Sequence, residues 1–385
     1  MSNNRITINP QLLTWAIDRA GLEMSTLTGR FPKLAEWEAG TVQPTLRQLE
    51  QFAHAVQIPI GYLFLPRPLE ETIPIPDFRT VANCGVKRPS PDLLDTVYLC
   101  QQRQDWYRDY GRIHGLPKLD FIGSVTLKDN PIAIAAAMGE QLGISVVDRQ
   151  QCANWTEALR QLMTQAEGAG VLVMASSIVG SNSHRKLKVS EFRGFALADD
   201  LAPLVFLNGA DSKAAQMFTL AHELAHLWLG ESGVSDTEAG RLPDQAIERW
   251  CNEVAAELLM PIGAICGAYE PGQALEEEVQ RLARLFKVST LVVLRRLCDA
   301  GVFSEAELWQ RYGEELERLR KVDRGGTGGG DFYRTLGART GKRFARALIA
   351  STLEGQTLFQ DAFRLLCVKK SATFYQAARE LGVML

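Results

Sequence analysis

The sequence predicts an α+β protein in which a small sheet is set between helical segments, and two observations lead to this fold class. The stretches 171–180, 191–200 and 202–208 have the composition of β-strands, and an Asp-Asp pair that favours a turn separates the last two. Longer segments on both sides carry apolar residues at the spacing of an α-helix. We therefore expect a mixed core flanked by all-helical N-terminal and C-terminal domains.

Length and composition are those of an ordinary globular protein with two or three domains. The chain has 385 residues, of which 46% are hydrophobic and 23% are charged. Its net charge of −3 gives no electrostatic argument that the whole molecule binds nucleic acid or an anionic membrane. The sequence has no run of 18 apolar residues and no signal-peptide stretch, so we expect a cytoplasmic protein without a membrane partner.

The cysteines give no sign of a disulfide framework or of a zinc site of their own. The seven cysteines are odd in number, scattered along the chain, and form no CxxC pair. In a reducing compartment such residues are usually small buried hydrophobes. We expect that role for most of them.

Residues 1–65 predict a compact all-helical unit. A helical pattern after Asn9 stops at Gly21, a short helix stops at Gly40, and a third helix opens with Pro44 in its first turn. The order of these helices resembles a helix-turn-helix domain of the Cro/repressor type.

This unit departs from a complete helix-turn-helix in length and in charge. Between Leu27 and Trp37 the chain is several residues shorter than a full second helix, turn and recognition helix need, so the domain is degenerate. Residues 1–70 hold six Lys/Arg against six Asp/Glu, whereas DNA binding relies on basic residues that neutralise phosphates. Docking to a protein or packing within the chain is favoured over sequence-specific DNA binding.

Residues 66–115 are expected to form an extended linker followed by a helix. Four prolines and the lack of any period in 66–80 favour polyproline II backbone. Residues 91–112 then show the pattern of an amphipathic helix.

Residues 116–270 form the mixed domain. Its helical patterns cover 131–143, 154–170, 211–230 and 245–261. The strand at 203–208 precedes the 211–230 helix and has two interpretations. It is either an exposed edge strand, which would pair with an extended peptide, or an interior strand, and the sequence does not separate the two.

The C-terminal third divides into a helical extension at 271–323, a Gly-rich hinge at 324–330 and a basic helical segment at 331–385. The Gly-rich stretch lacks the Lys-Ser/Thr of a phosphate loop and follows no strand, so a flexible hinge is favoured. The last segment holds nine Lys/Arg against four Asp/Glu. A structural or partner-binding tail is favoured there over contact with nucleic acid.

The chemistry of the chain is concentrated in FTLAHELAHLWLG, at 218–230. Residues four apart lie on one face of an α-helix, so His222 and His226 project side by side, with Glu223 just off that line. Two imidazoles at that separation can bind one metal ion.

A purely packing role for these histidines is the alternative. The flanking residues are uncharged and no proline interrupts the helix, which indicates a buried helix. Two adjacent imidazoles and a carboxylate are costly to bury without partners. Because the HExxH motif also has a defined metal chemistry, we favour a metal site.

The 245–261 helix offers Glu248, Glu253 and Glu257 as a third protein ligand. Glu248 and Asn252 share a helix face, so one can ligate the metal while the other steadies a ligating histidine. Glu253 lies about 140° around the helix from Glu248, so these two should not both face the metal.

Three stretches together carry a family resemblance: GFALADDLAPLVFLN, FTLAHELAH and ERWCNEVAAELLMP. They are similar to the ImmA/IrrE family of bacterial zinc-dependent metallo-endopeptidases, in which a Cro/repressor-like unit often precedes the peptidase. The resemblance implies a zincin-like, gluzincin-like core with an HExxH active-site helix. It also implies Zn²⁺ as cofactor, His222, His226 and Glu248 as ligands, Asn252 as a support of the ligands, and Glu223 as the catalytic residue.

The resemblance implies limited, site-specific cleavage of a cytoplasmic regulatory protein, such as a repressor or a toxin encoded nearby. Zinc would lower the pKa of a bound water toward about 7, and Glu223 would move the proton to the leaving amine. The alternative is a transcription regulator or antitoxin-like protein that binds DNA or a neighbouring toxin and has a structural or inactive metal site. The intact HExxH motif favours the peptidase.

Overall fold

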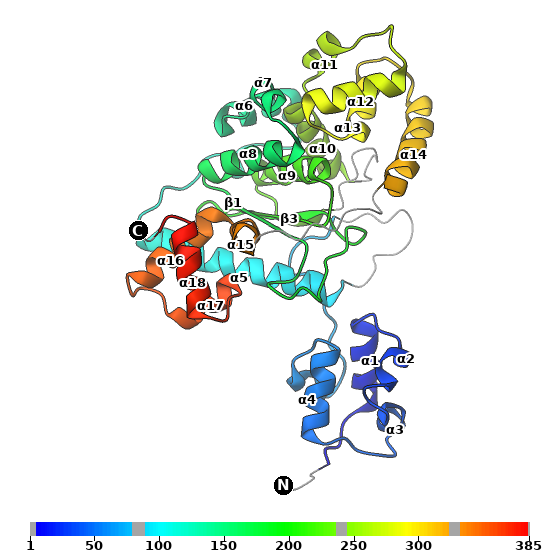
Figure 1. The fold of residues 1–385 in the computed structure, drawn as a ribbon, viewed down its shortest axis with the longest axis vertical. Coiled ribbons are helices and arrows are strands. Elements are labelled where there is room, and N and C mark those ends of the chain that lie inside the picture. The colour runs from blue at the N-terminus through cyan, green and yellow to red at the C-terminus, as the bar shows by residue number, and fades with distance from the viewer. Residues whose placement is uncertain (1–4, 79–88, 236–244, 323–331, 384–385) are drawn as a thin grey trace. The chain divides into compact units, whose positions relative to one another are not determined.

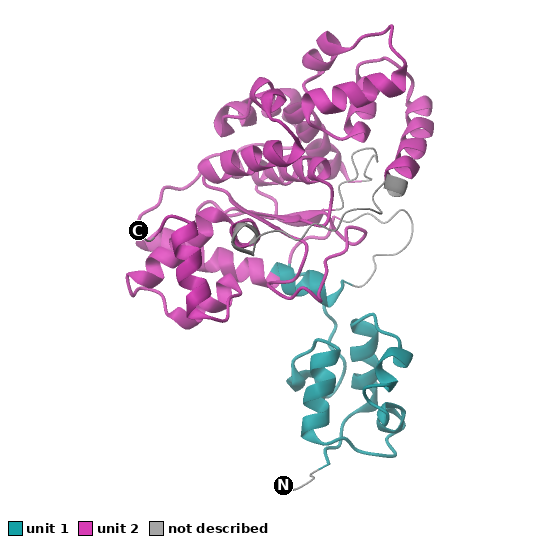
Figure 2. Cartoon of the chain, in the orientation of Figure 1, with its two compact units in different colours: residues 1–74, 87–97 teal, residues 75–86, 98–385 magenta. Residues whose placement is uncertain are grey.

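The computed structural model describes residues 5–78, 89–235, 245–322 and 332–383 (Figure 1). The chain divides into two compact units, which Figure 2 distinguishes by colour. Unit 1 comprises residues 1–74 and 87–97, and unit 2 comprises residues 75–86 and 98–385. The expected Gly-rich hinge lies outside the described residues.

Unit 1 is built from short helices. They are α1 (Pro10–Arg19), α2 (Met24–Thr28), α3 (Leu34–Glu38), α4 (Leu46–Ala55) and the 3-10 helix η1 (Ile60–Phe64). Thr45 and Gln48 form a capping box, which explains why α4 begins just after Pro44. Leu12, Trp37 and Phe52 belong to the apolar core of the unit. The three helices expected from the sequence are present.

The connector after unit 1 has no helix between residues 66 and 78, as its prolines predict. Its first part is attached to α1, because Arg19 forms an ion pair with Glu71 of the connector. Its last part, from Ile75 onward, belongs to unit 2.

Unit 2 contains a four-stranded mixed sheet. Its strands are β1 (Leu172–Ser176), β2 (Gly194–Leu197), β3 (Leu204–Asn208) and β4 (Gly233–Ser235), in the order β1-β3-β2-β4. β1 is parallel to β3, and the β3–β2 and β2–β4 pairs are antiparallel. The α+β class is confirmed. The sequence did not predict β4, because three residues are too few to show a period of two.

Strand β3 lies in the interior of the sheet. It pairs with β1 on one side and with β2 on the other. Of the two interpretations of residues 203–208, the interior strand is therefore correct. An added peptide strand would have to use an edge, and β4 is the edge strand that directly follows the histidine helix in the chain.

The remaining elements of unit 2 are helices. They are α5 (Pro91–Ile113), whose first residues belong to unit 1, α6 (Pro131–Leu142), α7 (Val146–Gln151), α8 (Trp155–Gly168), α9 (Lys213–Leu229), α10 (Ala246–Leu259), α11 (Ile262–Ala268), α12 (Leu275–Phe286), α13 (Thr290–Asp299), α14 (Glu305–Val322), α15 (Phe332–Thr340), α16 (Lys342–Leu353), α17 (Phe359–Leu366) and α18 (Ser371–Glu380). Among the helices of the described residues, none is by itself long and apolar enough to span a membrane; α10 and α11, bent by 47°, pass that test only as a pair.

Helices cover both faces of the sheet. Helix α9 packs on β2 and β3, and α8 packs on β1. Figure 1 shows α5 on the opposite side of the sheet from α8 and α9. Gln104 of α5 donates to the backbone oxygens of Leu197 and Ala202, both at 2.9 Å, which fixes α5 to the β2–β3 turn.

The close approach of β2 to α9 yields a prediction about Gly194. A Cβ at this position would lie 2.5 Å from Thr219 Cγ2 and 3.1 Å from Glu223 Oε1. We expect Gly194→Ala to lower the free energy of unfolding by about 1–3 kcal/mol, because overpacking forces neighbours to move. Urea denaturation measures the change. The control is Gly263→Ala, whose Cβ would meet nothing within 4 Å; equal stability of the two variants would contradict the prediction.

Candidate metal centre

Helix α9 is buried along most of its length. Ser212 caps its N-terminus, and Gly230, with φ of 74°, ends it in the left-handed conformation. Every side chain from residue 216 to residue 228 is buried. The polar groups of the HELAH motif therefore depend on one another and on the neighbouring elements for partners.

The side chains of His222, His226 and Glu248 converge on one point between α9 and α10. The two Nε2 atoms lie 3.0 Å apart. Glu248 Oε1 lies 3.0 Å from His226 Nε2, and Glu248 Oε2 lies 3.4 Å from His222 Nε2. Donors that share one tetrahedral zinc ion at about 2.1 Å are about 3.4 Å apart, so these separations suit a set of metal ligands.

Asn252 orients His222 from the other side of the ring. Asn252 Oδ1 lies 2.9 Å from His222 Nδ1. Since an amide oxygen only accepts hydrogen bonds, Nδ1 carries the hydrogen and donates it. In the neutral ring the lone pair is then on Nε2, the atom that faces Glu248 and His226.

The second histidine has an aromatic neighbour. The rings of Phe78 and His226 are stacked, with centroids 5.4 Å apart and planes inclined by 7°. Phe78 comes from the connector that precedes α5, so a segment far away in the sequence covers one face of this imidazole. No pattern in the sequence assigns Phe78 to the site, because aromatic residues in linkers are common.

Glu223 lies fully buried at the side of the converging donors. Burial raises the pKa of its carboxyl group well above the ordinary value, the charge of Glu248 adds to this rise, and the nearby Ser235 hydroxyl opposes it. A raised pKa makes the carboxylate a stronger proton acceptor. The missing side chain of Gly194 leaves the space that the carboxyl group occupies.

The protonation states of Glu248 and His226 favour metal binding. Burial alone would raise the pKa of Glu248, but the charges and hydrogen bonds of His222 and His226 outweigh it and lower the pKa to about 2. Burial lowers the pKa of His226, and its bond to Glu248 only partly opposes this effect. An ionised carboxylate and a neutral imidazole are the forms that ligate metals.

Cys251 is a further donor near the centre that sequence reasoning missed. Its sulfur and the ring nitrogens of the two histidines all lie within 4.8 Å of one another. Burial, followed by the charges of Glu248 and Glu223, raises the pKa of the Cys251 thiol well above the ordinary value. Because a cysteine ligand must be a thiolate, Glu248 is the better third donor. Cys251 follows Glu248 by three residues, and this spacing in the sequence could have shown that the two side chains share a helix face.

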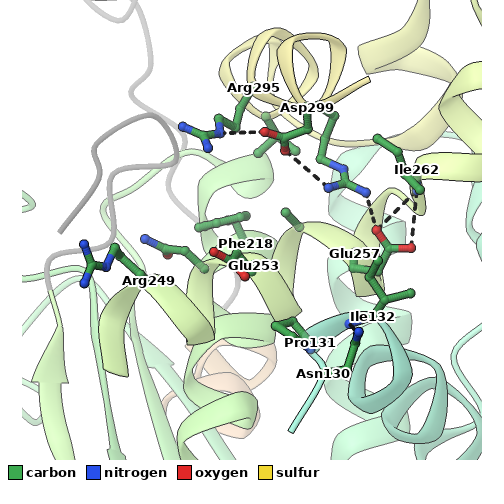
Figure 3. Close-up of a pocket in the computed structure, with 14 residues that line it drawn as sticks. Asn130, Pro131, Ile132, Phe218, Arg249, Glu253, Glu257, Ile262, Arg295 and Asp299 are labelled. Carbon is green, nitrogen blue, oxygen red and sulfur yellow. Dashed lines mark hydrogen bonds and ion pairs between the residues drawn. The ribbon is translucent and has the colours of Figure 1, made fainter. Parts of the chain in front are cut away.

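The other two glutamates considered as ligands face elsewhere. Glu257 forms an ion pair with Arg296 and accepts from the backbone N–H of Ile262 at 3.3 and 3.2 Å. Glu253 is exposed, and with Asn252 and Glu257 it lines a cavity of about 370 Å³, shown in Figure 3. Among the described contacts, only Glu248 of the three bonds to the histidines.

Comparison with known proteins covers the same part of the chain. Residues 166–298 match the family model described as the IrrE N-terminal-like domain, Peptidase_M78. The radiation response metalloprotease IrrE of Deinococcus radiodurans is 37% identical over 87 residues. Both matches support the ImmA/IrrE family for the domain at residues 166–298. The match covers 20% of this chain and 26% of that relative, so it spans about a quarter of the relative's length.

The comparisons confirm the resemblance that the three stretches predicted, for the peptidase domain. A second family model, described as a domain of unknown function (DUF8813), matches residues 340–380. This second match covers α16, α17 and α18.

A metallopeptidase family implies a metal ion, and the residues present fit one. Two imidazoles and a carboxylate are a known zinc ligand set. Here they converge in a buried place, next to a second buried carboxyl group, Glu223. Buried carboxylates are costly without a compensating cation, so a divalent ion suits the charges as well as the separations.

The contact of Asn252 with His222 predicts an effect on metal affinity. We expect Asn252→Ala to weaken zinc binding by about 10–100-fold, because the hydrogen bond that holds the ring and its tautomer is lost. Competition with a chromogenic chelator measures the affinity. Asn252→Asp keeps an acceptor oxygen and should remain near wild type; equal losses in both variants would contradict a role through this hydrogen bond.

Proposed function

We propose that the chain is a zinc-dependent endopeptidase that makes a limited, site-specific cut in a cytoplasmic regulatory protein, a repressor or a partner encoded nearby. The observation that supports this most strongly is the convergence of His222, His226 and Glu248 beside the buried carboxyl group of Glu223. Family membership supports the metallopeptidase class. The limited nature of the cut and its target rest on the family resemblance alone.

In this proposal His222, His226 and Glu248 would hold the metal in a zincin-like, gluzincin-like site. When bound there, zinc supplies Lewis-acid activation of the water and of the scissile carbonyl group.

Glu223 acts as the general base of the proposed reaction. Its carboxylate takes the proton of the attacking water and passes it to the leaving amine. The burial that raises its pKa supports this role, because a stronger base accepts a proton more readily. Asn252 keeps His222 in the tautomer that presents Nε2 to the centre.

The N-terminal helices are proposed as a degenerate helix-turn-helix-like domain that docks to a protein. The balance of acidic and basic residues over residues 1–70 supports a protein partner over DNA. The competing hypothesis for the whole chain is a regulator or antitoxin-like protein whose metal site is structural or inactive. Incubation with the proteins encoded by the adjacent genes, with and without chelator, separates the two: chelator-sensitive cleavage supports the peptidase, and tight binding without cleavage supports the alternative.

The first prediction from this proposal concerns the ligands. We expect about one zinc ion per chain in the purified protein, near-complete loss of zinc in His222→Ala/His226→Ala, and a large loss of zinc affinity in Glu248→Ala. Glu253→Ala is the matched control on the same helix, and it should bind zinc like the wild type. Elemental analysis gives the stoichiometry; a large loss at Glu253 with wild-type affinity at Glu248 would overturn the ligand assignment.

The second prediction concerns the base. We expect Glu223→Gln to keep the fold and the zinc while cleavage of a genuine target falls by at least about 100-fold, because the amide preserves the shape but accepts no proton. Circular dichroism and elemental analysis are the controls for fold and metal. Undiminished cleavage by this variant would show that another group moves the proton.

A further inference from the structure

The edge strand β4, beside the metal centre, pairs with a segment of the chain's own connector. Val234, in the middle of β4, donates its N–H to the backbone oxygen of Pro76 at 3.0 Å and accepts from the N–H of Phe78 at 2.9 Å. Asp77 and Val234 form a parallel bridge. Residues 76–78, which we call the strap, therefore lie along β4 as a short added strand.

The Phe78 side chain of the strap packs closely against the metal centre. The ring of Phe78 stacks on His226 with centroids 5.4 Å apart. It also fills the space that the missing side chain of Gly233 leaves, because a Cβ there would lie 2.1 Å from the ring. Gly233 has no positive φ, so the glycine is required by the close approach and not by the backbone conformation.

Strand β4 leads directly to the groups of the proposed reaction. Its last residue, Ser235, pairs across the sheet with Gly194, and a Cβ at Gly194 would lie 3.1 Å from Glu223 Oε1. Its first residue, Gly233, faces the ring that covers His226. An extended peptide that pairs with this edge must therefore pass both the proposed base and one of the proposed ligands.

Protection of a sheet edge from aggregation is the simpler explanation of the strap. The strap is poorly suited to that task alone, because Pro74 and Pro76 have no backbone N–H and limit the ladder that the connector can form. A peptide without prolines could form a longer ladder with the same edge. The placement of an aromatic ring on a proposed metal ligand is also unnecessary for covering an edge.

We infer that the edge of β4, with the space above Gly233 and the face of His226, is the peptide-binding site of unit 2, and that the strap is its internal occupant. The site takes an extended peptide that adds a strand to the sheet and places a large aromatic side chain over Gly233. The substrate must displace the strap, so the strap is autoinhibitory. This inference rests on the proposed peptidase function for its consequence, but peptide binding itself is independent of cleavage.

The experiment uses the full chain with Glu223→Gln, so that no turnover complicates binding. The probe is a peptide with the sequence of residues 73–78, fluorescein-IPIPDF-amide, and its affinity is measured by fluorescence polarisation. We expect Phe78→Ala to bind this peptide at least 10-fold more tightly than the parent, because the competing ring is gone. The peptide fluorescein-IPIPDA-amide should show no such gain. The control for loss of an aromatic side chain is Phe64→Ala in unit 1, where Phe64 is 50% exposed.

A substitution in β4 tests the space above Gly233 from the side of the sheet. Gly233→Ala, combined with Phe78→Ala, should abolish the gain in peptide affinity, because the new Cβ excludes the peptide's aromatic ring. In Gly233→Ala alone, hydrogen exchange at the Phe78 amide should accelerate at least 10-fold. Gly263→Ala, whose Cβ meets nothing within 4 Å, is the matched control.

Equal affinity of the parent and Phe78→Ala for the peptide would overturn the inference, and so would an equal gain with the alanine peptide. If Phe78→Ala fails to fold, unchanged Phe78 exchange in Gly233→Ala overturns the inference on its own. An inactive peptidase that binds the peptide as expected would refute the proposed function and leave this site intact.

Discussion

The burial of three polar side chains on α9 is the constraint on which the rest of unit 2 depends. A helix enclosed on all sides offers no water to His222, Glu223 and His226, and unpaired polar groups in such a place are costly. Helix α10 meets this requirement because it packs on α9 and carries Glu248 and Asn252 one turn apart. The packing of α10 on α9 therefore also brings together the polar groups of the centre.

The sheet approaches the same centre closely at two glycines. Gly194 on β2 allows the backbone to approach Thr219 and Glu223, and Gly233 on β4 accepts the ring of Phe78. Larger side chains at these positions would push the strands away from α9. Glu223 and His226 thus lie between α10, which carries Glu248, and a sheet edge that offers backbone hydrogen-bonding groups.

The connector links these features to the organisation of the chain. The segment that leaves the N-terminal helices is held to α1 through Glu71, and a few residues later it reaches β4 and His226. Its prolines prevent a regular helix and a regular strand alike. A segment of this kind can cover a site although few backbone hydrogen bonds hold it there. This agrees with the inference that a substrate peptide displaces the strap.

The sequence by itself determined the features that depend on local periodicity and on a motif. Helical spacing, caps and glycine stops predicted the helices from Pro10 to Arg19, from Lys213 to Leu229 and from Ala246 to Leu259. The HExxH spacing predicted that His222 and His226 share a face. These are properties of residues a few positions apart, and short-range sterics and hydrogen bonding decide them.

Only the tertiary structure decided what lies next to what. It placed β3 in the interior and β4 at the edge, since strand order depends on which distant segments pair. Helix geometry alone had left Glu248, Glu253 and Glu257 open, and the family resemblance implied Glu248; among the described contacts the tertiary structure brings Glu248 to the histidines, and it adds Cys251 and Phe78 to their surroundings. Such neighbours arise from the packing of elements that are remote in the chain, and no local pattern in one sequence records which remote segment will fill a given space.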